Sequence, residues 1–381
     1  MRKLLLPMLL GTAFLATTRT AAAVENEAED HGLSIAVFGD SPYGVDDADT
    51  AQFNATPAFI KTINQDRDVS LVLQVGDIHS GKQTCSFGYD KTIYDMWTAF
   101  EAPLVYTPGD NEWMDCHKPK EGSQPVLQNL AYVREIFFAT PGKAIGGDKT
   151  VMSQAQYFDA QYPSDSQFVE NTMWEQAGVV FISVNVPGGS NNGEDNWFNL
   201  DRTKPQTDEI LKRTAAAQRW LDRGFALGQS HRARAVLIQL QADMWDLDGT
   251  ATKDLHIANY RQYIDNIARN TAQFGKPVLL INGDSHGYRS DNPLTKGAAC
   301  VSENGAAEVA CADDAYNAHP NGYKLSNFHR IVVHGSTAPM EWIKLQIKPG
   351  DSEGRNVTNA TANSFGPFSW KRMIQALPPK P

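Results

Sequence analysis

Four short apolar segments of this sequence end in a glycine followed at once by an aspartate, and the aspartates are Asp40, Asp77, Asp110 and Asp284. Glycine lets the backbone turn sharply and approach a ligand closely, while aspartate supplies carboxylate oxygen. One such pair is ordinary turn chemistry. Four of them predict a shared site, because ligands bind beyond the carboxyl ends of the strands in open α/β sheets.

Carboxylates packed this closely repel one another, and some of them would have to take up protons. Two divalent cations would cancel the four negative charges. His286 and Asn111 add neutral ligands close to these aspartates in the sequence. Oxygen-rich coordination suits Mn, Mg or Ca, and the imidazole admits Zn or Fe. A pair of such ions is suited to hydrolysing phosphate esters, because it generates hydroxide near neutral pH and holds the attacking and leaving oxygens.

The segments that would position these residues alternate between short β-branched runs and longer amphipathic stretches. Short length, β-branching and flanking Gly or Pro favour strands at residues 33–38, 71–75, 104–107, 179–186, 235–240, 278–281, 331–333 and 342–347. The spacing of apolar residues predicts helices at 89–100, 126–138, 208–227 and 255–274. This alternation indicates an α/β domain with much parallel pairing. We expect one catalytic domain over residues 30–350 and a loosely ordered tail over 351–381.

In their order along the chain, these motifs resemble those of the calcineurin-like metallophosphoesterase family. The family pattern runs D-x-H, GDxx(D/Y), GNH(D/E), a lone His after a strand, and GHxH. The counterparts here are GDSP at 39–42, GDIHS at 76–80, GDNE at 109–112, LQAD at 240–243 and GDSH at 283–286. The resemblance implies a four-layer α/β/β/α sandwich, in which two mixed β-sheets lie between helices and the metal ions bind at the strand ends.

Carried over position by position, the resemblance implies that Asp40, Asp77 and His286 are metal ligands and that Asp77 bridges two ions. Asp284 takes the place of the first His of GHxH. The expected cofactors are therefore divalent metal ions, two in number, with Mn, Fe, Zn, Mg and Ca all open.

The third motif allows two assignments. Asp110 takes the place of the family's amide ligand, which puts Asn111 where the family often has a His that assists the leaving group. A shift of one residue would instead make Asn111 the ligand. Because an amide cannot act as a general acid, the proton for the leaving group would come from His79, from His117 or from a metal-bound water.

The sequence also departs from the family pattern at three other positions. Pro42 replaces the His of D-x-H, Ser80 replaces the Asp or Tyr of the second block, and Gln239 or Gln241 stands where the lone His would be. Asp243 is a candidate to replace that His. The resemblance implies a metal-dependent phosphoesterase that hydrolyses monoesters or diesters by metal-bound hydroxide. The departures favour an alternative, a non-catalytic relative that binds a metal or a phosphorylated ligand.

Other features of the sequence limit which substrates and partners are expected. Arg289, three residues after His286, is a candidate for binding the substrate phosphate bidentately, and an ordinary salt bridge is its alternative role. The formal net charge of −10 argues against sequence-independent binding to nucleic acid. The P-loop and HExxH patterns are absent, which argues against two common classes of rival hydrolases.

The first 23 residues have the features of a signal peptide. Arg2 and Lys3 precede an apolar run over residues 4–16, and Ala21–Ala23 offers small residues for cleavage. That run is too short for an ordinary spanning helix, and no later stretch is long and apolar enough. We therefore expect a secreted or periplasmic protein without a membrane span once the signal is removed.

Export makes the four cysteines candidates for disulfide bonds, and four cysteines allow three pairings. We favour Cys85–Cys116, which would join the loops after the predicted strands 71–75 and 104–107, and Cys300–Cys311, which would close an insertion of low apolar content. The sequence has no CxxC motif, so a thiolate zinc site is not expected.

Overall fold

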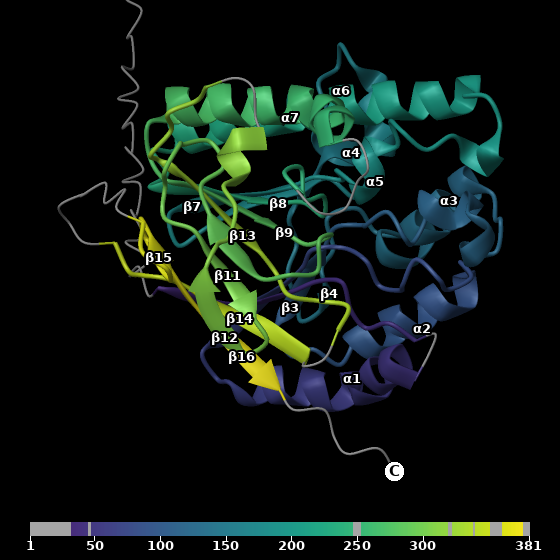
Figure 1. The fold of residues 1–381 in the computed structure, drawn as a ribbon, viewed down its shortest axis with the longest axis horizontal. Coiled ribbons are helices and arrows are strands. Elements are labelled where there is room, and N and C mark those ends of the chain that lie inside the picture. Colours follow the sequence, from purple (N-terminus) through teal and green to yellow (C-terminus); the bar gives the residue numbers. More distant parts are fainter. Residues whose placement is uncertain are drawn as a thin grey trace, which may run out of the picture.

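The computed structural model describes residues 32–44, 47–246, 253–318, 322–337, 340–350 and 360–375. Two mixed β-sheets pack against each other, and helices cover their outer faces (Figure 1). The long helices α6 (Lys204–Ser230) and α7 (Lys253–Phe274) lie at the top of the view, and α1 (Asp47–Gln65) and α2 (Phe87–Trp97) lie at the bottom. The predicted four-layer α/β/β/α sandwich is confirmed.

The first sheet has seven strands in the order β15-β16-β14-β1-β2-β3-β4. Strands β1, β2 and β3 are parallel, so their carboxyl ends lie at one edge, and the flanking strands pair antiparallel. The strand bounds are β1 (Leu33–Phe38), β2 (Val69–Gln74), β3 (Pro103–Tyr106), β4 (Ile145–Gly146), β14 (Met340–Ile347), β15 (Ser364–Phe365) and β16 (Phe368–Gln375).

The second sheet has nine strands in the order β12-β11-β10-β13-β9-β8-β7-β6-β5. Its central strands β13, β9, β8 and β7 are parallel. The strand bounds are β5 (Met152–Ser153), β6 (Thr172–Gln176), β7 (Val179–Ser183), β8 (Ala235–Gln239), β9 (Val278–Asn282), β10 (Arg289–Asp291), β11 (Val301–Asn304), β12 (Ala307–Ala310) and β13 (Phe328–Val332).

The other helices are shorter. They are α3 (Val126–Phe137), α4 (Gln154–Tyr157), α5 (Gly188–Asn191) and the 3₁₀ turns Asp115–His117, Pro119–Glu121, Pro163–Gln167, Trp197–Asn199 and Ala315–Ala318. Within the described ranges, every helix is too short or too polar to cross a bilayer.

The central strands bury both of their faces, which explains why their sequences are continuously apolar. In β1, Ile35 and Val37 pack in the core between the two sheets, whereas Ala36 and Phe38 pack under the helices of the first sheet. A third core fills the space between the second sheet and the helices α6 and α7, where it includes Trp220. The strand ends, and the site that they carry, are therefore held in place by three packed hydrophobic cores.

All the predicted strands and helices are present, with ends that differ by a few residues. Helix α1 was not predicted, because Pro57 lies inside it and polar residues surround its apolar ones. Its buried face nevertheless has helical spacing, formed by Ala55, Phe59, Ile60 and Ile63.

The prediction of a loosely ordered tail is wrong for residues 364–375. Strand β16 pairs along its whole length with β14, and Phe365 and Phe368 are fully buried in the core between the sheets. Alternate residues Phe368, Trp370 and Arg372 are buried, which is the period of a strand. The Gly, Asn and Ser residues around this segment obscured that pattern. Residues 1–23 of the predicted signal peptide lie outside the described residues, as do 351–359 and 376–381.

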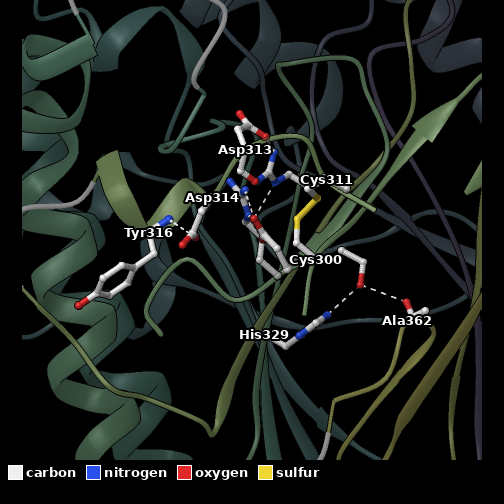
Figure 2. The surroundings of a disulfide bond; sticks show 11 residues. Cys300, Cys311, Asp313, Asp314, Tyr316, His329 and Ala362 are labelled. Atoms are coloured by element: carbon white, nitrogen blue, oxygen red, sulfur yellow. Dashed lines mark hydrogen bonds and ion pairs between the residues drawn. A yellow bond between two sulfur atoms is a disulfide. The ribbon is translucent and has the colours of Figure 1, made fainter. Parts of the chain in front are cut away.

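Both predicted disulfide bonds are confirmed. Cys85–Cys116 joins the loops that follow β2 and β3, and both cysteines are buried. Cys300–Cys311 closes the hairpin of β11 and β12 (Figure 2). Such bonds persist in oxidising compartments, so they are compatible with an extracellular location.

Candidate metal centre

Four aspartates and one histidine meet where the carboxyl ends of the parallel strands of the two sheets adjoin. Asp40, Asp77 and Asp110 follow β1, β2 and β3 of the first sheet, while Asp284 and His286 follow β9 of the second. The backbone N–H of Asp284 donates to Oδ1 of Asp40 at 3.0 Å, which ties the two sheets together at this point.

Three of these residues form a group that suits a metal ion. One ligand atom each from Asp40, Asp77 and His286 lies within 4.8 Å of the others. Oδ2 of Asp40 is buried and has no hydrogen-bond partner. A buried acceptor without a donor is costly unless a proton or a cation meets it, so this donor set fits a divalent ion.

Glycines allow the backbone to come this close to the carboxylates. A Cβ atom on Gly109 would lie 1.9 Å from Oδ1 of Asp77, and one on Gly283 would lie 2.3 Å from Oδ2 of Asp40. No side chain fits at such distances. Across the centre, the glycine of one Gly-Asp pair therefore makes room for the aspartate of another.

The backbone is also held in an uncommon conformation here. The φ angles of Asp40 (47°), Asp77 (55°), Asp284 (77°) and His286 (65°) all lie in the left-handed region. Residues with a side chain adopt this region rarely, and such residues cluster where the surrounding structure enforces a functional geometry.

Burial is the main electrostatic feature of the centre. It raises the pKa of Asp40, Asp77 and Asp284 well above the ordinary value of an aspartate, and repulsion among the neighbouring carboxylates adds to this increase. Burial raises the pKa of Asp110 as well. The acids therefore retain protons unless a cation takes their place.

The structure distinguishes the side chains of Asp110 and Asn111. Oδ1 of Asp110 accepts a hydrogen bond from Nε2 of Gln241 at 2.9 Å. Asn111 instead donates its Nδ2 to Oδ2 of Asp77 at 3.2 Å and to the carbonyl oxygen of His79 at 3.0 Å. Asp110 thus presents a carboxylate to the centre, whereas Asn111 presents donor hydrogens.

The imidazole of His79 lies beside the centre rather than in it. It packs edge-on against Tyr89, with ring centroids 5.8 Å apart. Burial lowers its pKa to about 4, so the ring is neutral at pH 7 and cannot donate a proton as imidazolium. Through its carbonyl oxygen, His79 holds Asn111 in position.

Arg289 is occupied by carboxylates. Its guanidinium donates to Asp291 at 2.7 Å and to Asp313 at 3.0 Å, and Figure 2 shows Asp313 near the Cys300–Cys311 disulfide. The alternative role of a salt bridge therefore describes the geometry of Arg289, whose guanidinium has no free edge for a bidentate phosphate.

Sequence reasoning missed the ion pair that supports Asp284. Arg330, fully buried in β13, pairs with Asp243 and donates to Asp291 at 2.8 Å. Asp243 accepts a hydrogen bond from Ser285 at 2.8 Å and donates its backbone N–H to Oδ2 of Asp284 at 2.9 Å. A basic residue inside the apolar run of β13 was the available signal, since a buried charge requires a partner.

A cleft of about 740 Å³ opens beside the centre and reaches from Asp284 and His286 to the disulfide hairpin. The Asp, Glu, His and Arg residues of its described lining are mostly acidic. They are Asp243, Asp246, Asp284, Glu303, Asp313, His286, Arg289 and Arg330.

The chain matches a family of known proteins. The family model of the calcineurin-like phosphoesterases matches residues 33–241. A solved structure that resembles the chain is a purple acid phosphatase from yellow lupin (Lupinus luteus) seeds, with 13% identity and a TM-score of 0.36 over 83% of this chain and 49% of the other. The chain therefore spans about half of that protein. A search of curated proteins finds no match. Because the family match covers more than half of its residues, this chain belongs to the calcineurin-like phosphoesterase family.

Proposed function

We propose that this protein is an exported, metal-dependent phosphoesterase that hydrolyses phosphate monoesters or diesters at the centre described above. The observation that carries this proposal is the convergence of buried aspartates around an acceptor, Oδ2 of Asp40, that no donor meets. The two disulfide bonds support the assignment to an oxidising compartment.

The residues that would hold the ion are Asp40, Asp77 and His286, with Asp110 and Asp284 completing the anionic surroundings. When bound, a divalent cation activates water and stabilises the charge that develops on the phosphoryl oxygens. The hydroxyl of Tyr43 lies 3.3 Å from Nε2 of His286 and fixes the orientation of this ring. Burial raises the pKa of Tyr43 well above 10, so its hydroxyl retains its proton at neutral pH.

Replacement of the central carboxylate tests the proposal. We expect Asp77→Asn to lower kcat/KM for p-nitrophenyl phosphate by at least about 100-fold, because this carboxylate is one of the three side chains of the ligand group. The matched control is Asp95→Asn, at a surface residue paired with Lys91, which should retain full activity. Turnover by Asp77→Asn at the rate of the unmodified protein would refute the assignment of the site.

The acidic cleft indicates a substrate with one phosphate. Both of its arginines are already shared between carboxylates, so neither is available for a second phosphate. We expect kcat/KM for p-nitrophenyl phosphate to exceed that for ATP by at least about tenfold, since like charges brought together cost several kcal/mol. The assays need buffered free Mn²⁺, because ATP binds the metal. A preference for ATP would contradict this expectation.

A second candidate is a relative that binds metal without catalysis. It is favoured by the environment of the leaving group, where Asn111 has no acidic proton and His79 is neutral and turned toward Tyr89. Elemental analysis combined with assays of mono- and diester substrates separates the two. Tight metal occupancy without any turnover would select the second candidate.

A further inference from the structure

We propose that the centre binds a single divalent cation, and that the side-chain amide of Gln241 fills the position between Asp77 and Asp110 that a second cation would need. This inference rests on the metal binding of the proposed function and is independent of its chemistry.

Gln241 is fully buried and lies between the two carboxylates. Its Nε2 is 3.2 Å from Oδ2 of Asp77 and 2.9 Å from Oδ1 of Asp110. An amide nitrogen in this place donates hydrogen bonds to both carboxylates. A cation bridging the same two oxygens would have to occupy the same space.

The oxygen atom of this amide fixes the orientation of the group. The backbone N–H of Gly188 donates to Oε1 of Gln241. Because an N–H can only donate, the atom that faces it must be the oxygen, and the NH₂ group must face the aspartates. Turning the amide over would leave the Gly188 N–H facing another donor.

The aliphatic part of Gln241 packs against the loop that follows β2. A Cβ atom on Gly76 would lie 2.4 Å from Cγ of Gln241, so this side chain packs directly against the backbone of the β2 loop. The carbonyl oxygen of Gln241 accepts the backbone N–H of Gly283 at 3.0 Å, which ties it to the loop that carries Asp284.

The hydrogen bonds to Asp77 leave a place for only one ion. Oδ1 accepts the backbone N–H of Asn111 at 3.2 Å, and Oδ2 accepts the amides of both Asn111 and Gln241. Two carboxylate oxygens offer about four lone-pair positions, of which three are used. The remaining position serves the group formed with Asp40 and His286, where Oδ2 of Asp40 has no donor. Asp77 is thus a ligand to one ion rather than a bridge between two.

The stoichiometry of Mn²⁺ tests the first half of this proposal. Metal-free full-length protein is dialysed against Mn²⁺, and bound metal is measured by mass spectrometry and by electron paramagnetic resonance. We expect one Mn²⁺ per chain and the six-line spectrum of an isolated ion. Two ions per chain with an exchange-coupled spectrum would overturn the proposal and leave the phosphoesterase function standing. One ion without turnover would overturn only the catalytic function, and no binding would overturn both.

Two variants test the role of Gln241 itself. Gln241→Ala removes the side chain from the space between Asp77 and Asp110, and we expect it to bind two Mn²⁺ per chain with a coupled spectrum. The matched control Gln241→Met keeps this space filled without supplying a ligand and should bind one. A folded Gln241→Ala protein that still binds one ion would overturn the assignment to this residue. If circular dichroism shows that Gln241→Ala does not fold, the stoichiometry of the unmodified protein still decides whether the centre holds one ion.

Discussion

Without metal, the protein should become less stable as the pH rises from 5.5 to 8. Burial and mutual repulsion raise the pKa values of Asp40, Asp77 and Asp284 in the folded state, whereas an unfolded aspartate titrates near 3.9. Above about pH 4 the folded state therefore binds more protons than the unfolded state, and its stability falls as pH rises through that window. Each extra proton contributes a slope of about 1.4 kcal/mol per pH unit.

Bound metal should restore much of the stability that the metal-free protein loses as the pH rises. An ion that binds only the folded state at about 100 times its Kd adds about 2.7 kcal/mol, and it replaces protons that are scarce at pH 8 but abundant at pH 5.5. We expect melting temperatures in EDTA to fall by about 5 °C or more from pH 5.5 to 8, and Mn²⁺ to raise them more at pH 8. Calorimetry at both pH values, with and without Mn²⁺, measures the effect. A metal-free melting temperature that rises over this range would contradict the expectation.

Two acids away from the ligand group provide the control. Burial raises the pKa of Glu121 to about 9 and that of Asp90 to about 8, so both also destabilise the fold at alkaline pH. Their contribution should not respond to Mn²⁺. Glu121→Gln and Asp90→Asn should each flatten the pH dependence in EDTA while preserving the increment from metal, whereas Asp40→Asn should reduce that increment.

The sequence predicted most of the features that depend on local pattern. Strands buried on both faces appear as continuous apolar runs, and a glycine before an aspartate marks each strand end that carries the site. What it could not predict depends on the direction in which a side chain points across the fold. Gln241 was visible only as a missing histidine, and nothing local indicates that its amide lies between two aspartates. Asn111 was open to two roles for the same reason.

The wrong prediction for the tail and the two roles left open for Arg289 have a similar origin. Composition suggested that the segment after residue 350 was loosely ordered, yet Phe368 and Trp370 find partners in a core built by strands far away in the sequence. Arg289 follows the last motif closely enough to suggest a phosphate ligand, but Asp291 and Asp313 already neutralise it. In both cases the direction in which side chains point decided the outcome, and a single sequence does not display it.

The same kind of distant pairing makes Arg330 a residue whose loss should cost much stability. Burial alone would raise the pKa of Asp291, yet Arg330 and Arg289 hold it below its usual value, so this carboxyl is a buried charge stabilised by arginine. Arg330 also lies 5.2 Å from the ring of Trp245. We expect Arg330→Gln to lower the free energy of unfolding by about 3–5 kcal/mol, because it leaves buried carboxylates without their cation.

A matched variant separates this effect from the loss of any arginine. Arg289→Gln removes the other partner of Asp291 but leaves Arg330 in place, and its side chain is partly exposed, so we expect a cost of about 1 kcal/mol. Arg330→Gln should also weaken Mn²⁺ binding by about 10- to 100-fold, because Asp243 would no longer be held where its N–H supports Asp284. Urea denaturation and Mn²⁺ titration of both variants measure these quantities. Equal losses in the two variants would mean that Arg330 stabilises the fold as an ordinary surface pair does and plays no part in positioning the metal ligands.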